Sequence, residues 1–452
     1  MVEVHFGTNG VRGRFDSLNP ELALKLGKAI GRYLGKNIGV GRDGRKTGLC
    51  LKNALISGLM SAGSNVVDFD VVPSPTAELM IKEAGLDGTA VVTASHNPPE
   101  WNAIKVTDKR MAPVSRERGE KIERMMKKAK DVEWDRVGEY RIERNAVKVH
   151  MERIKNFVDC GAIARRKPFF ILDCGNGTAS LMVGMFKDMG VDVLSINDTI
   201  DWRFPGRPSE PREENLADLR NAVVELKADG GIAWDGDGDR VVFVDEKGNF
   251  LSGDKVVALS VLKRAKEGKK GVFVTTVATS MAAGDVAKKY GCSVAYTKVG
   301  APYMAEKVAK TKNVFLAGEE VGGVIWPELS LAKDGFMTAA KIIELIVKER
   351  KKLSEILENN VPAYYFLKTT VECREEKKKK VVERLKNEMK KEYGKLITVD
   401  GVRADYEGGW LIVRASGTEP IIRIFSENKD ERKAREVMEY WATRVGRLRT
   451  LF

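Results

Sequence analysis

Short apolar runs alternate with amphipathic stretches along most of the chain. Pro168–Asp173 and Gly271–Thr276 are two such runs, and each ends in a polar turn before a stretch of helical periodicity. A short uninterrupted apolar run is typical of a strand that is buried on both faces. Because strands of this kind alternate with helices, the pattern predicts parallel α/β domains.

Changes in this pattern divide the chain into domains. With 452 residues, the chain is long enough for three or four domains, each with its own core. The C-terminal part combines strands with a long charged helix over Glu375–Lys391 and a final helix over Lys429–Val445, which predicts an α+β domain. A helix over Val114–Lys130 precedes the first boundary. The predicted domains are residues 1–150, 151–252, 253–362 and 363–452.

The formal net charge of +13 raises the question of whether the protein binds nucleic acid. Basic proteins often bind nucleic acid, and salt-dependent retention on DNA would support that alternative. Here, however, Lys and Arg are interleaved with Glu along helical stretches, as on solvated, ion-paired faces. No apolar run is long enough to span a bilayer, and the first residues contain no signal pattern. We therefore expect a cytoplasmic protein that binds neither nucleic acid nor membrane.

Two further features of the composition bear on redox state and stability. The five cysteines are scattered, odd in number and without metal-binding spacing, so we expect neither a disulfide nor zinc. Glutamine is absent, whereas Lys, Arg and Glu are abundant, a bias typical of hyperthermophile proteins. We expect a heat-loving source, and a melting midpoint of about 45–65 °C would contradict this expectation.

The most informative segment has the sequence TASHNPP and directly follows the apolar run Gly88–Val92. Because its two prolines prevent an immediate helix, Ser95 is predicted to lie at the carboxyl end of a strand, the edge at which open α/β sheets bind ligands. A hydroxyl beside the imidazole of His96 suits a nucleophile with a nearby base. Of the three histidines, only His96 lies in such a segment.

A second segment, DGDGDR, carries three carboxylates at alternating positions and ends with Arg240. Asp235, Asp237 and Asp239 would repel one another strongly unless a cation neutralised them. A site with oxygen ligands only suits magnesium, with calcium or manganese as alternatives. The segment therefore predicts a metal loop.

A third segment, RASGTEP, lies between two apolar runs near the C-terminus. The hydroxyls of Ser416 and Thr418 and the backbone around Gly417 can bind phosphate oxygens. Arg414 and Arg423 on either side offer planar charged donors, and Arg is rarely placed in apolar runs without an anionic partner. The segment predicts a phosphate site.

Two other polar segments are less specific. The sequence GEEVGG follows the apolar run Val314–Ala317, so that Glu319 is placed to bind sugar hydroxyls at the end of a strand. Arg12 lies in a predicted loop over Phe6–Gly13, whose glycines allow close approach of the backbone to phosphate. On local sequence alone, a solvated turn explains each segment about as well.

These five segments, in this order, resemble the α-D-phosphohexomutase family of archaeal type, which includes phosphoglucomutases, phosphomannomutases and phosphoglucosamine mutases. The resemblance covers essentially the whole chain. TASHNP matches the family's phosphoserine loop, DGDGDR its magnesium loop, GEEVGG its sugar-recognition loop and RASGTEP its distal phosphate site. It implies three similar mixed-sheet α/β domains and a smaller C-terminal α+β domain around one cleft.

The resemblance also implies a role for each candidate residue. Ser95 would carry the phosphoryl group, and His96 and Lys105 would handle protons near it. The implied metal ligands are Ser95, Asp235, Asp237 and Asp239; Arg12, Arg240 and Lys298 match positions around the phosphoserine or the sugar; Glu319 would contact the sugar; and Arg414, Ser416, Gly417, Thr418 and Arg423 would hold the distal phosphate.

The implied reaction is the reversible conversion of a hexose or hexosamine 6-phosphate into the 1-phosphate. It would need Mg²⁺, a phosphoserine at Ser95 and a sugar 1,6-bisphosphate primer, and its partner would be a small phosphosugar. The oligomeric state is left open. The alternative is a metal-dependent phosphohydrolase that uses the same phosphoserine; the distal phosphate site argues against it, because a mutase must hold the phosphate that is not reacting.

The sequence departs from the family at two places. Val321 and Gly323 stand where many relatives have a polar residue and His, which leaves the preferred sugar open among glucosamine, mannose and glucose phosphates. Trp101-Asn102-Ala103 replaces the more usual Tyr-Asn-Gly after the serine loop, a change that we expect to be tolerated.

Overall fold

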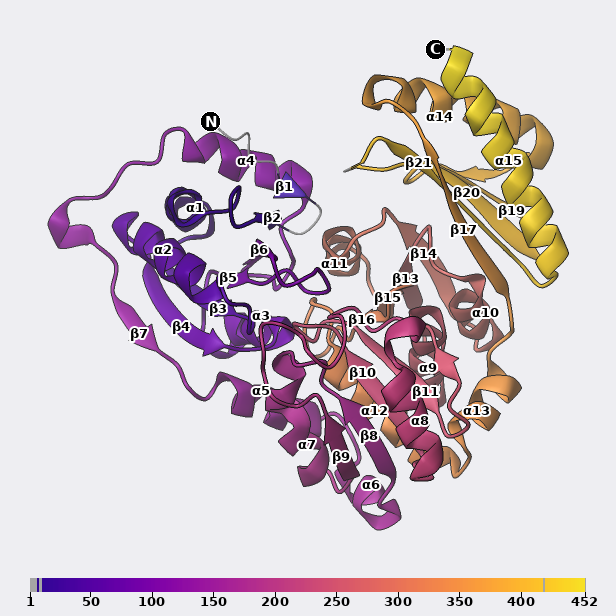
Figure 1. The fold of residues 1–452 in the computed structure, drawn as a ribbon, viewed down its shortest axis with the longest axis horizontal. Helices are drawn as coiled ribbons and strands as arrows, with labels where there is room; N and C mark the ends of the chain where they lie inside the picture. The colour runs from indigo at the N-terminus through magenta and orange to yellow at the C-terminus, as the bar shows by residue number, and fades with distance from the viewer. Residues whose placement is uncertain (1–5, 8–9, 418, 452) are drawn as a thin grey trace.

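The structure is a computed structural model that describes residues 6–7, 10–417 and 419–451. These residues form four β-sheets with helices packed against them. Figure 1 shows the domain of the first sheet at the upper left and that of the fourth at the upper right, with the second and third sheets below and between them.

The first sheet has seven strands in the order β1-β2-β6-β5-β3-β4-β7. Helices α1, α2 and α4 pack on one face through residues such as Leu26 and Leu55, and α3 and α5 pack on the other through Ala77 and Ala146. The elements are β1 (Phe6–Gly7), β2 (Gly10–Arg14), α1 (Pro20–Leu34), β3 (Asn37–Arg42), α2 (Gly48–Ser61), β4 (Asn65–Val71), α3 (Ser74–Glu83), β5 (Gly88–Val92), β6 (Trp101–Asp108), α4 (Arg116–Met126), η1 (Trp134–Arg136), β7 (Tyr140–Ile142) and α5 (Ala146–Lys155).

The second sheet has the order β12-β11-β10-β8-β9, and the third has the order β14-β13-β15-β16. The second domain contains α6 (Cys160–Arg166), β8 (Phe169–Asp173), η2 (Thr178–Met182), α7 (Val183–Asp188), β9 (Asp192–Ile196), η3 (Glu213–Asn215), α8 (Ala217–Glu225), β10 (Gly230–Trp234), β11 (Val241–Asp245) and β12 (Phe250–Leu251). The third contains α9 (Gly253–Lys266), β13 (Val272–Thr276), α10 (Met281–Lys289), β14 (Ser293–Thr297), α11 (Ala301–Lys310), β15 (Val314–Glu319), β16 (Gly323–Ile325), α12 (Gly335–Glu349) and α13 (Leu353–Asn360).

These three sheets share one four-strand pattern. In each, three parallel strands are followed along the chain by a strand that returns antiparallel to the last of them: β6 returns beside β5, β11 beside β10 and β16 beside β15. The loop that joins the last parallel strand to its return strand therefore occupies the same topological position in all three domains. The predicted architecture of three similar mixed-sheet α/β domains is confirmed.

The fourth sheet is antiparallel and has the order β17-β21-β20-β19-β18. Its helices pack on one face, where Val381, Leu385 and Trp441 join the core, and Trp410 and Phe425 on the other face pack against Val277 and Ala278 of the third domain. The elements are β17 (Tyr365–Glu372), α14 (Glu375–Tyr393), β18 (Leu396–Ile397), β19 (Val402–Tyr406), β20 (Gly409–Ala415), β21 (Ile421–Asn428) and α15 (Glu431–Leu451). The expected smaller α+β domain is confirmed.

Three local predictions need correction. Arg12 lies in strand β2, which pairs with β6, and not in a loop. Helix α4 begins only after Ser115, whose side chain caps it, and it ends at Met126, well before Lys130. The final helix begins at Glu431, because the carboxylate of Asp430 accepts hydrogen bonds from the next turn, and it extends beyond Val445.

Two expectations from composition can be compared with the structure. All five cysteines are free thiols. Within the part of the chain that the structure describes, no helix is both long and apolar enough to cross a bilayer.

Candidate active site

The predicted loops occupy equivalent positions in the first three sheets. Ser95 follows β5, the three aspartates join β10 to β11, and Glu319 ends β15 directly before the turn to β16. Each of these loops joins the last parallel strand of its sheet to the antiparallel return strand. Ligand sites of such sheets lie at the carboxyl ends of the parallel strands. The shared topology therefore places the Ser95 hydroxyl, the three aspartates and Glu319 each at such an end.

Ser95 is buried and has a left-handed backbone, with φ at 52°. Such a conformation is costly for a residue with a side chain, and it directs the hydroxyl out of the strand. Ser95 Oγ donates to Oδ2 of Asp235 at 2.5 Å, and its backbone N–H donates to Oγ1 of Thr93 at 3.0 Å. The hydroxyl of the first domain thus faces the carboxylates of the second.

Arg45, which the sequence analysis missed, holds the serine loop. Its guanidinium donates to the backbone carbonyls of Ser95 at 3.0 Å, Asn97 at 2.6 Å and Trp101 at 3.0 Å. Asp43 fixes the same guanidinium by accepting from its Nε at 3.0 Å. The signal in the sequence was the pair of charged residues just after the run that forms β3 (Asn37–Arg42), in the same setting as the other loops.

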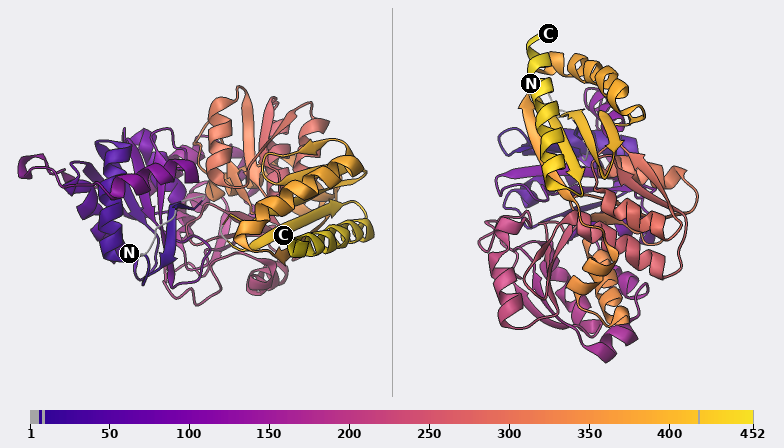
Figure 2. Two further views of the ribbon diagram at one scale, coloured as in Figure 1. Left: turned by 90° about the horizontal axis from the view of Figure 1, so that it is seen from above. Right: turned by 90° about the vertical axis from the view of Figure 1, so that its right-hand side faces the viewer.

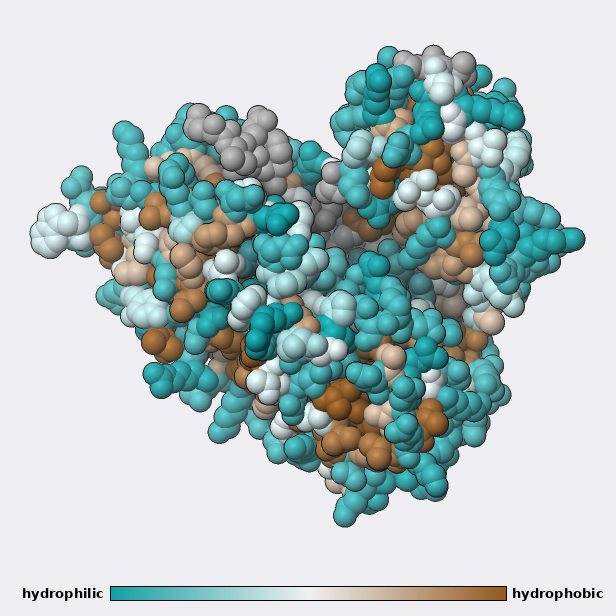
Figure 3. Space-filling view, viewed as in Figure 1, coloured by the Kyte–Doolittle hydropathy of each residue, from teal (hydrophilic) through white to brown (hydrophobic). Residues whose placement is uncertain are grey.

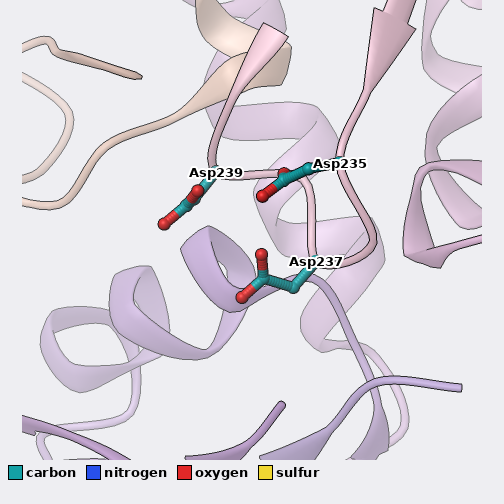
Figure 4. Close-up of side chains that lie close together, drawn as sticks. All are labelled: Asp235, Asp237 and Asp239. Atoms are coloured by element: carbon teal, nitrogen blue, oxygen red, sulfur yellow. The ribbon is translucent and has the colours of Figure 1, made fainter. Parts of the chain in front are cut away.

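Asp235, Asp237 and Asp239 form one buried cluster in which a ligand oxygen of each lies within 4.8 Å of the others. Figure 4 shows the three carboxylates converging from one loop. Among the described residues, no hydrogen-bond donor reaches Oδ1 of Asp237 or of Asp239. Burial, and then the charges of Asp239 and Asp237, raise the pKa of Asp235. Orphaned carboxylate oxygens in a buried, crowded cluster fit a hard divalent cation.

The metal loop packs directly on the serine loop. A Cβ at Gly236 would lie 2.8 Å from the carbonyl oxygen of Ser95 and 2.6 Å from Oγ of Ser209. Ser209 donates to the same carbonyl at 2.8 Å. Only glycine fits between the two loops at this position, so the close contact between the domains depends on it.

Cationic side chains surround the carboxylates. Lys105 Nζ lies 2.5 Å from Oδ2 of Asp237 and 3.5 Å from Oδ2 of Asp239. Burial alone would lower the pKa of Lys105, but the charges of Asp237 and Asp239 outweigh burial and raise this pKa. Arg240 Nε lies 3.8 Å from Oδ1 of Asp239 and 4.0 Å from Oδ2 of Asp235.

Two further residues of this cluster were not predicted. Lys333 joins two of the predicted loops, because its Nζ lies 3.3 Å from Oδ2 of Asp239 and 3.0 Å from Oε1 of Glu319. Ser74 donates to Oδ2 of Asp237 at 2.5 Å. Ser74 begins α3, and Lys333 precedes the residue that caps α12. No sequence motif marks either of them.

His96 is placed to exchange a proton with the serine. Its Nδ1 lies 3.4 Å from Oγ of Ser95. Burial, followed by the charges of Arg240 and Arg12, lowers the pKa of His96 to about 2, so the imidazole is neutral near pH 7. Arg12 itself donates to the side-chain oxygen of Asn97, in the same loop.

Lys298 lies apart from this buried cluster. Its side chain is about half exposed, its Nζ is 3.7 Å from Oε1 of Glu117, and it lies 5.2 Å from the ring centroid of Tyr303. The neighbouring Val299 donates its backbone N–H to Asp400 of the fourth domain at 3.1 Å. Lys298 therefore belongs to the region where the first, third and fourth domains meet.

The predicted phosphate loop joins β20 to β21. Arg414 Nη2 lies 3.0 Å from Oδ2 of Asp400, and Arg423 Nη2 lies 2.5 Å from Oε2 of Glu419. Lys378, another residue that the sequence analysis missed, donates to the backbone carbonyl of Ser416 at 2.5 Å. Thr418 lies outside the described residues.

This loop also reaches the first domain. The carbonyl of the exposed Gly417 accepts a hydrogen bond from Arg116 at the start of α4, at 3.4 Å. Figure 3 shows a hollow in the surface between the lobes of the first and fourth domains. The phosphate loop is thus placed at the rim, and the serine and metal loops form the buried centre.

Comparison with known proteins assigns this chain to a family. Four domain families match in order: "Phosphoglucomutase/phosphomannomutase, alpha/beta/alpha domain I" over residues 3–133, domain II over 148–248, domain III over 252–364, and the C-terminal domain over 370–443. The chain belongs to the phosphoglucomutase/phosphomannomutase family. It is a phosphomutase, an enzyme of the isomerase class.

Individual relatives agree over nearly the full length. A phosphoglucomutase/phosphomannomutase of Thermococcus kodakarensis is 43% identical over 444 residues, which are 96% of each chain. A probable phosphoglucosamine mutase of Methanopyrus kandleri is 40% identical and covers 98% of each chain. The crystal structure of a phosphoglucomutase/phosphomannomutase family protein from Burkholderia thailandensis matches with a TM-score of 0.88, 25% identity and coverage of 98% of this chain and 97% of that one. None of these relatives supports the phosphohydrolase alternative.

Proposed function

We propose that this phosphomutase interconverts the 6-phosphate and the 1-phosphate of a hexose or hexosamine, with Ser95 as the phosphoryl carrier. The observation that carries the proposal is the placement of the Ser95 hydroxyl, which is buried, lies on a left-handed backbone and is 2.5 Å from Asp235 of the opposing domain. A neutral imidazole stands 3.4 Å away. This combination of nucleophile, base and carboxylate cluster suits phosphoryl transfer.

Each half-reaction would exchange one bond for another. The O–P bond of phosphorylated Ser95 breaks as a sugar hydroxyl attacks the phosphorus, and the proton of that hydroxyl passes to a nearby base. His96 is the proposed base because its Nδ1 lies 3.4 Å from Oγ of Ser95. Lys105, Arg12 and Arg240 would neutralise the charge that spreads over the phosphoryl oxygens. The reverse transfer returns the other phosphate of the bisphosphate to Ser95.

The proposed metal is Mg²⁺, held by Asp235, Asp237, Asp239 and Ser95. The orphaned Oδ1 atoms of Asp237 and Asp239 fit such an ion. When bound, a divalent cation supplies positive charge to the transferring phosphoryl group. The bisphosphate is the proposed primer that first phosphorylates Ser95.

The remaining assignments concern the sugar. We propose that Glu319 contacts sugar hydroxyls, since it is buried at the end of β15 beside the metal cluster. Lys298 at the rim would contact the sugar or its phosphate. The fourth-domain loop with Arg414, Ser416, Gly417, Thr418 and Arg423 would hold the phosphate that is not reacting. The boundaries at residues 252 and 362 are proposed as limits of the functional units, and the predicted boundary at residue 150 falls within α5 (Ala146–Lys155).

The named relatives differ in the sugars that their names give, so the substrate has to be measured. The test is conversion of glucosamine, mannose and glucose 6-phosphates to 1-phosphates, with Mg²⁺, a trace of bisphosphate and free phosphate monitored. Conversion without phosphate release is expected, and the relative rates rank the sugars. Release of phosphate without 1-phosphate would contradict the proposed cycle, and inactivity on all three would contradict the substrate class.

A further inference from the structure

The connector between α4 and α5 carries an exposed apolar surface away from the cleft. Trp134 is 88% exposed, Val137 46%, Tyr140 45% and Ile142 50%. Figures 1 and 2 show the connector as an arm that projects beyond the first domain. Most of it, residues 134–145, lies between the matches to the first and second family domains, which end at 133 and begin at 148. Apolar side chains concentrated on one projecting segment are typical of an interaction surface.

Strand β7 of this arm has an open edge. Within the described part of the chain, it is the last strand of its sheet and pairs with β4 alone. The backbone groups of Glu139 and Glu143 bond to β4, at 2.8 and 2.9 Å. Because alternate residues of a strand face the same neighbour, the N–H and C=O groups of Tyr140 and Ile142 point to the outer edge. Open edges of this kind are templates for pairing with another strand.

We propose that β7 pairs antiparallel with β7 of a second copy of this chain, across a twofold axis at Ile142. In that register each Arg141 lies opposite Glu143 of the other copy, and the two Ile142 side chains meet. Opposite charges and apolar pairs at facing positions stabilise antiparallel strands. The sequence of the strand is therefore complementary to itself.

Other registers fit less well. An axis at Arg141 would place Arg141 opposite Arg141 and Glu139 opposite Glu143, so that like charges face each other. An axis at Tyr140 would pair Ile142 with Gly138, whose N–H already donates to the carbonyl of Met60 at 3.0 Å. Charge and hydrogen bonding thus select the axis at Ile142.

The surroundings of the strand support a second copy as the partner. The connector over residues 127–145 contains five acidic and six basic residues, so it carries almost no net charge although the whole chain has a net charge of +13, and two arms repel each other only weakly. The connector runs along the end of α2, with backbone hydrogen bonds from Val132 to Ser61 and from Gly138 to Met60.

A stable dimer buries about 1,200 Å² or more, so Trp134 and Val137 must extend the contact beyond the short strand.

The proposed dimer leaves the active site open. In the sheet order, β3 and β4 separate β7 from β5, the strand that leads to Ser95. Changes in β7 should therefore alter the oligomeric state and leave mutase activity per chain unchanged. This separation allows the dimer to be tested independently of the proposed catalytic roles.

Sedimentation and light scattering over a concentration series test the proposal with the full-length chain. We expect a species of twice the 50.1 kDa chain mass. Arg141→Glu alone and Glu143→Arg alone should each raise the dimer dissociation constant by about tenfold or more, because like charges then face each other. The double variant restores opposite charges and should recover the parent dimer.

Two further variants complete the test. Ile142→Pro should abolish the dimer, since it removes an outward N–H while the bonds to β4 remain, and its melting temperature checks the fold. Trp134→Ser should weaken the dimer without affecting the strand. A chain that stays monomeric up to about 100 µM overturns the proposal and leaves the arm to a different partner. A dimer that is indifferent to Ile142→Pro, or a double variant no better than the single variants, overturns it as well.

Discussion

The buried centre and the rim of this site are built in opposite ways. At the centre, Ser95, Asp237 and Lys105 are almost wholly buried and linked to one another or to the opposing domain by short contacts. At the rim, Arg414 and Arg423 are only partly buried, and each is paired with a carboxylate. A phosphate bound there as proposed would displace the carboxylates from the two arginines or share the arginines with them, whereas the groups at the centre already contact one another.

The difference follows from what each region has to do. In-line phosphoryl transfer depends on donors and charges that are already in position, because reorganising them during the reaction costs activation free energy. In the proposed cycle, the distal site would accept first one end of the bisphosphate and then the other. An open loop whose arginines have exchangeable partners suits that alternation better than a rigid pocket.

The largest expected effect comes from removing the two serine hydroxyls one at a time. Ser95→Ala should lower kcat by about 10⁴-fold or more, because no other hydroxyl of the loop replaces the nucleophile. Ser416→Ala, a buried serine in the rim loop, is the matched control and should mainly raise KM. Comparable losses of kcat in both variants, measured by 1-phosphate formation, would remove the distinction between centre and rim.

Neutralising one metal-site carboxylate should have the next largest effect. Asp237→Asn removes a charge that faces Lys105 and Ser74, and it leaves the cluster with fewer ligands for a divalent cation. We expect metal affinity to fall by about 100-fold or more and activity to fall with it. Calorimetric titration with Mg²⁺ checks the affinity directly. Asp245→Asn, a buried aspartate that accepts bonds from its own turn, serves as control. Parent-like Mg²⁺ binding by Asp237→Asn would exclude this aspartate from the site.

The sequence was most informative where a polar loop follows an apolar strand. The loops with Ser95 and Glu319 could be placed at strand ends because the preceding runs are uninterrupted and apolar. Arg12 was placed in a loop because glycines mark turns, yet β6 offers a partner that makes the same residues a strand. Such pairing is tertiary and has no local signal.

Residues that support the site were harder to find than those at its centre. Arg45 acts through backbone carbonyls fifty or more positions further along the chain, and Lys333 acts by joining loops of two domains. Neither belongs to a motif, because what each one contacts is decided by how the domains pack. The open edge of β7 was not predicted for the same reason, since its exposure depends on the order of strands in the sheet.

Removing one arginine from the rim should give a moderate effect on binding. Arg414→Ala removes the proposed charge-assisted contact to phosphate. Such a contact contributes about 1.5–3 kcal/mol, so KM should rise by about 10- to 100-fold with a smaller change in kcat. Arg435→Ala, an exposed arginine paired with Glu431 on α15, is the matched control and should leave both constants unchanged. Parent-like KM in Arg414→Ala would separate this residue from the phosphate site.

The last prediction concerns the stability of the buried centre and not the catalytic constants. Burial is the main reason that the pKa of Glu78 is raised to about 8, and Thr107 donates to its Oε1 at 3.0 Å. The folded protein therefore keeps this proton up to about pH 8, whereas the unfolded chain releases it near pH 4.5, so stability falls as pH rises between these values. Glu78→Gln cannot ionise, so between pH 5 and pH 8 it should gain about 3 kcal/mol of unfolding free energy relative to the parent. Denaturant unfolding of metal-free protein at both pH values measures this difference in stability.

Thr107→Val removes the hydroxyl donor but leaves Glu78 able to ionise, so its stability should vary with pH as steeply as that of the parent. If the stability of Glu78→Gln varied with pH as steeply as that of the parent, the pKa of Glu78 would not be raised in the folded protein.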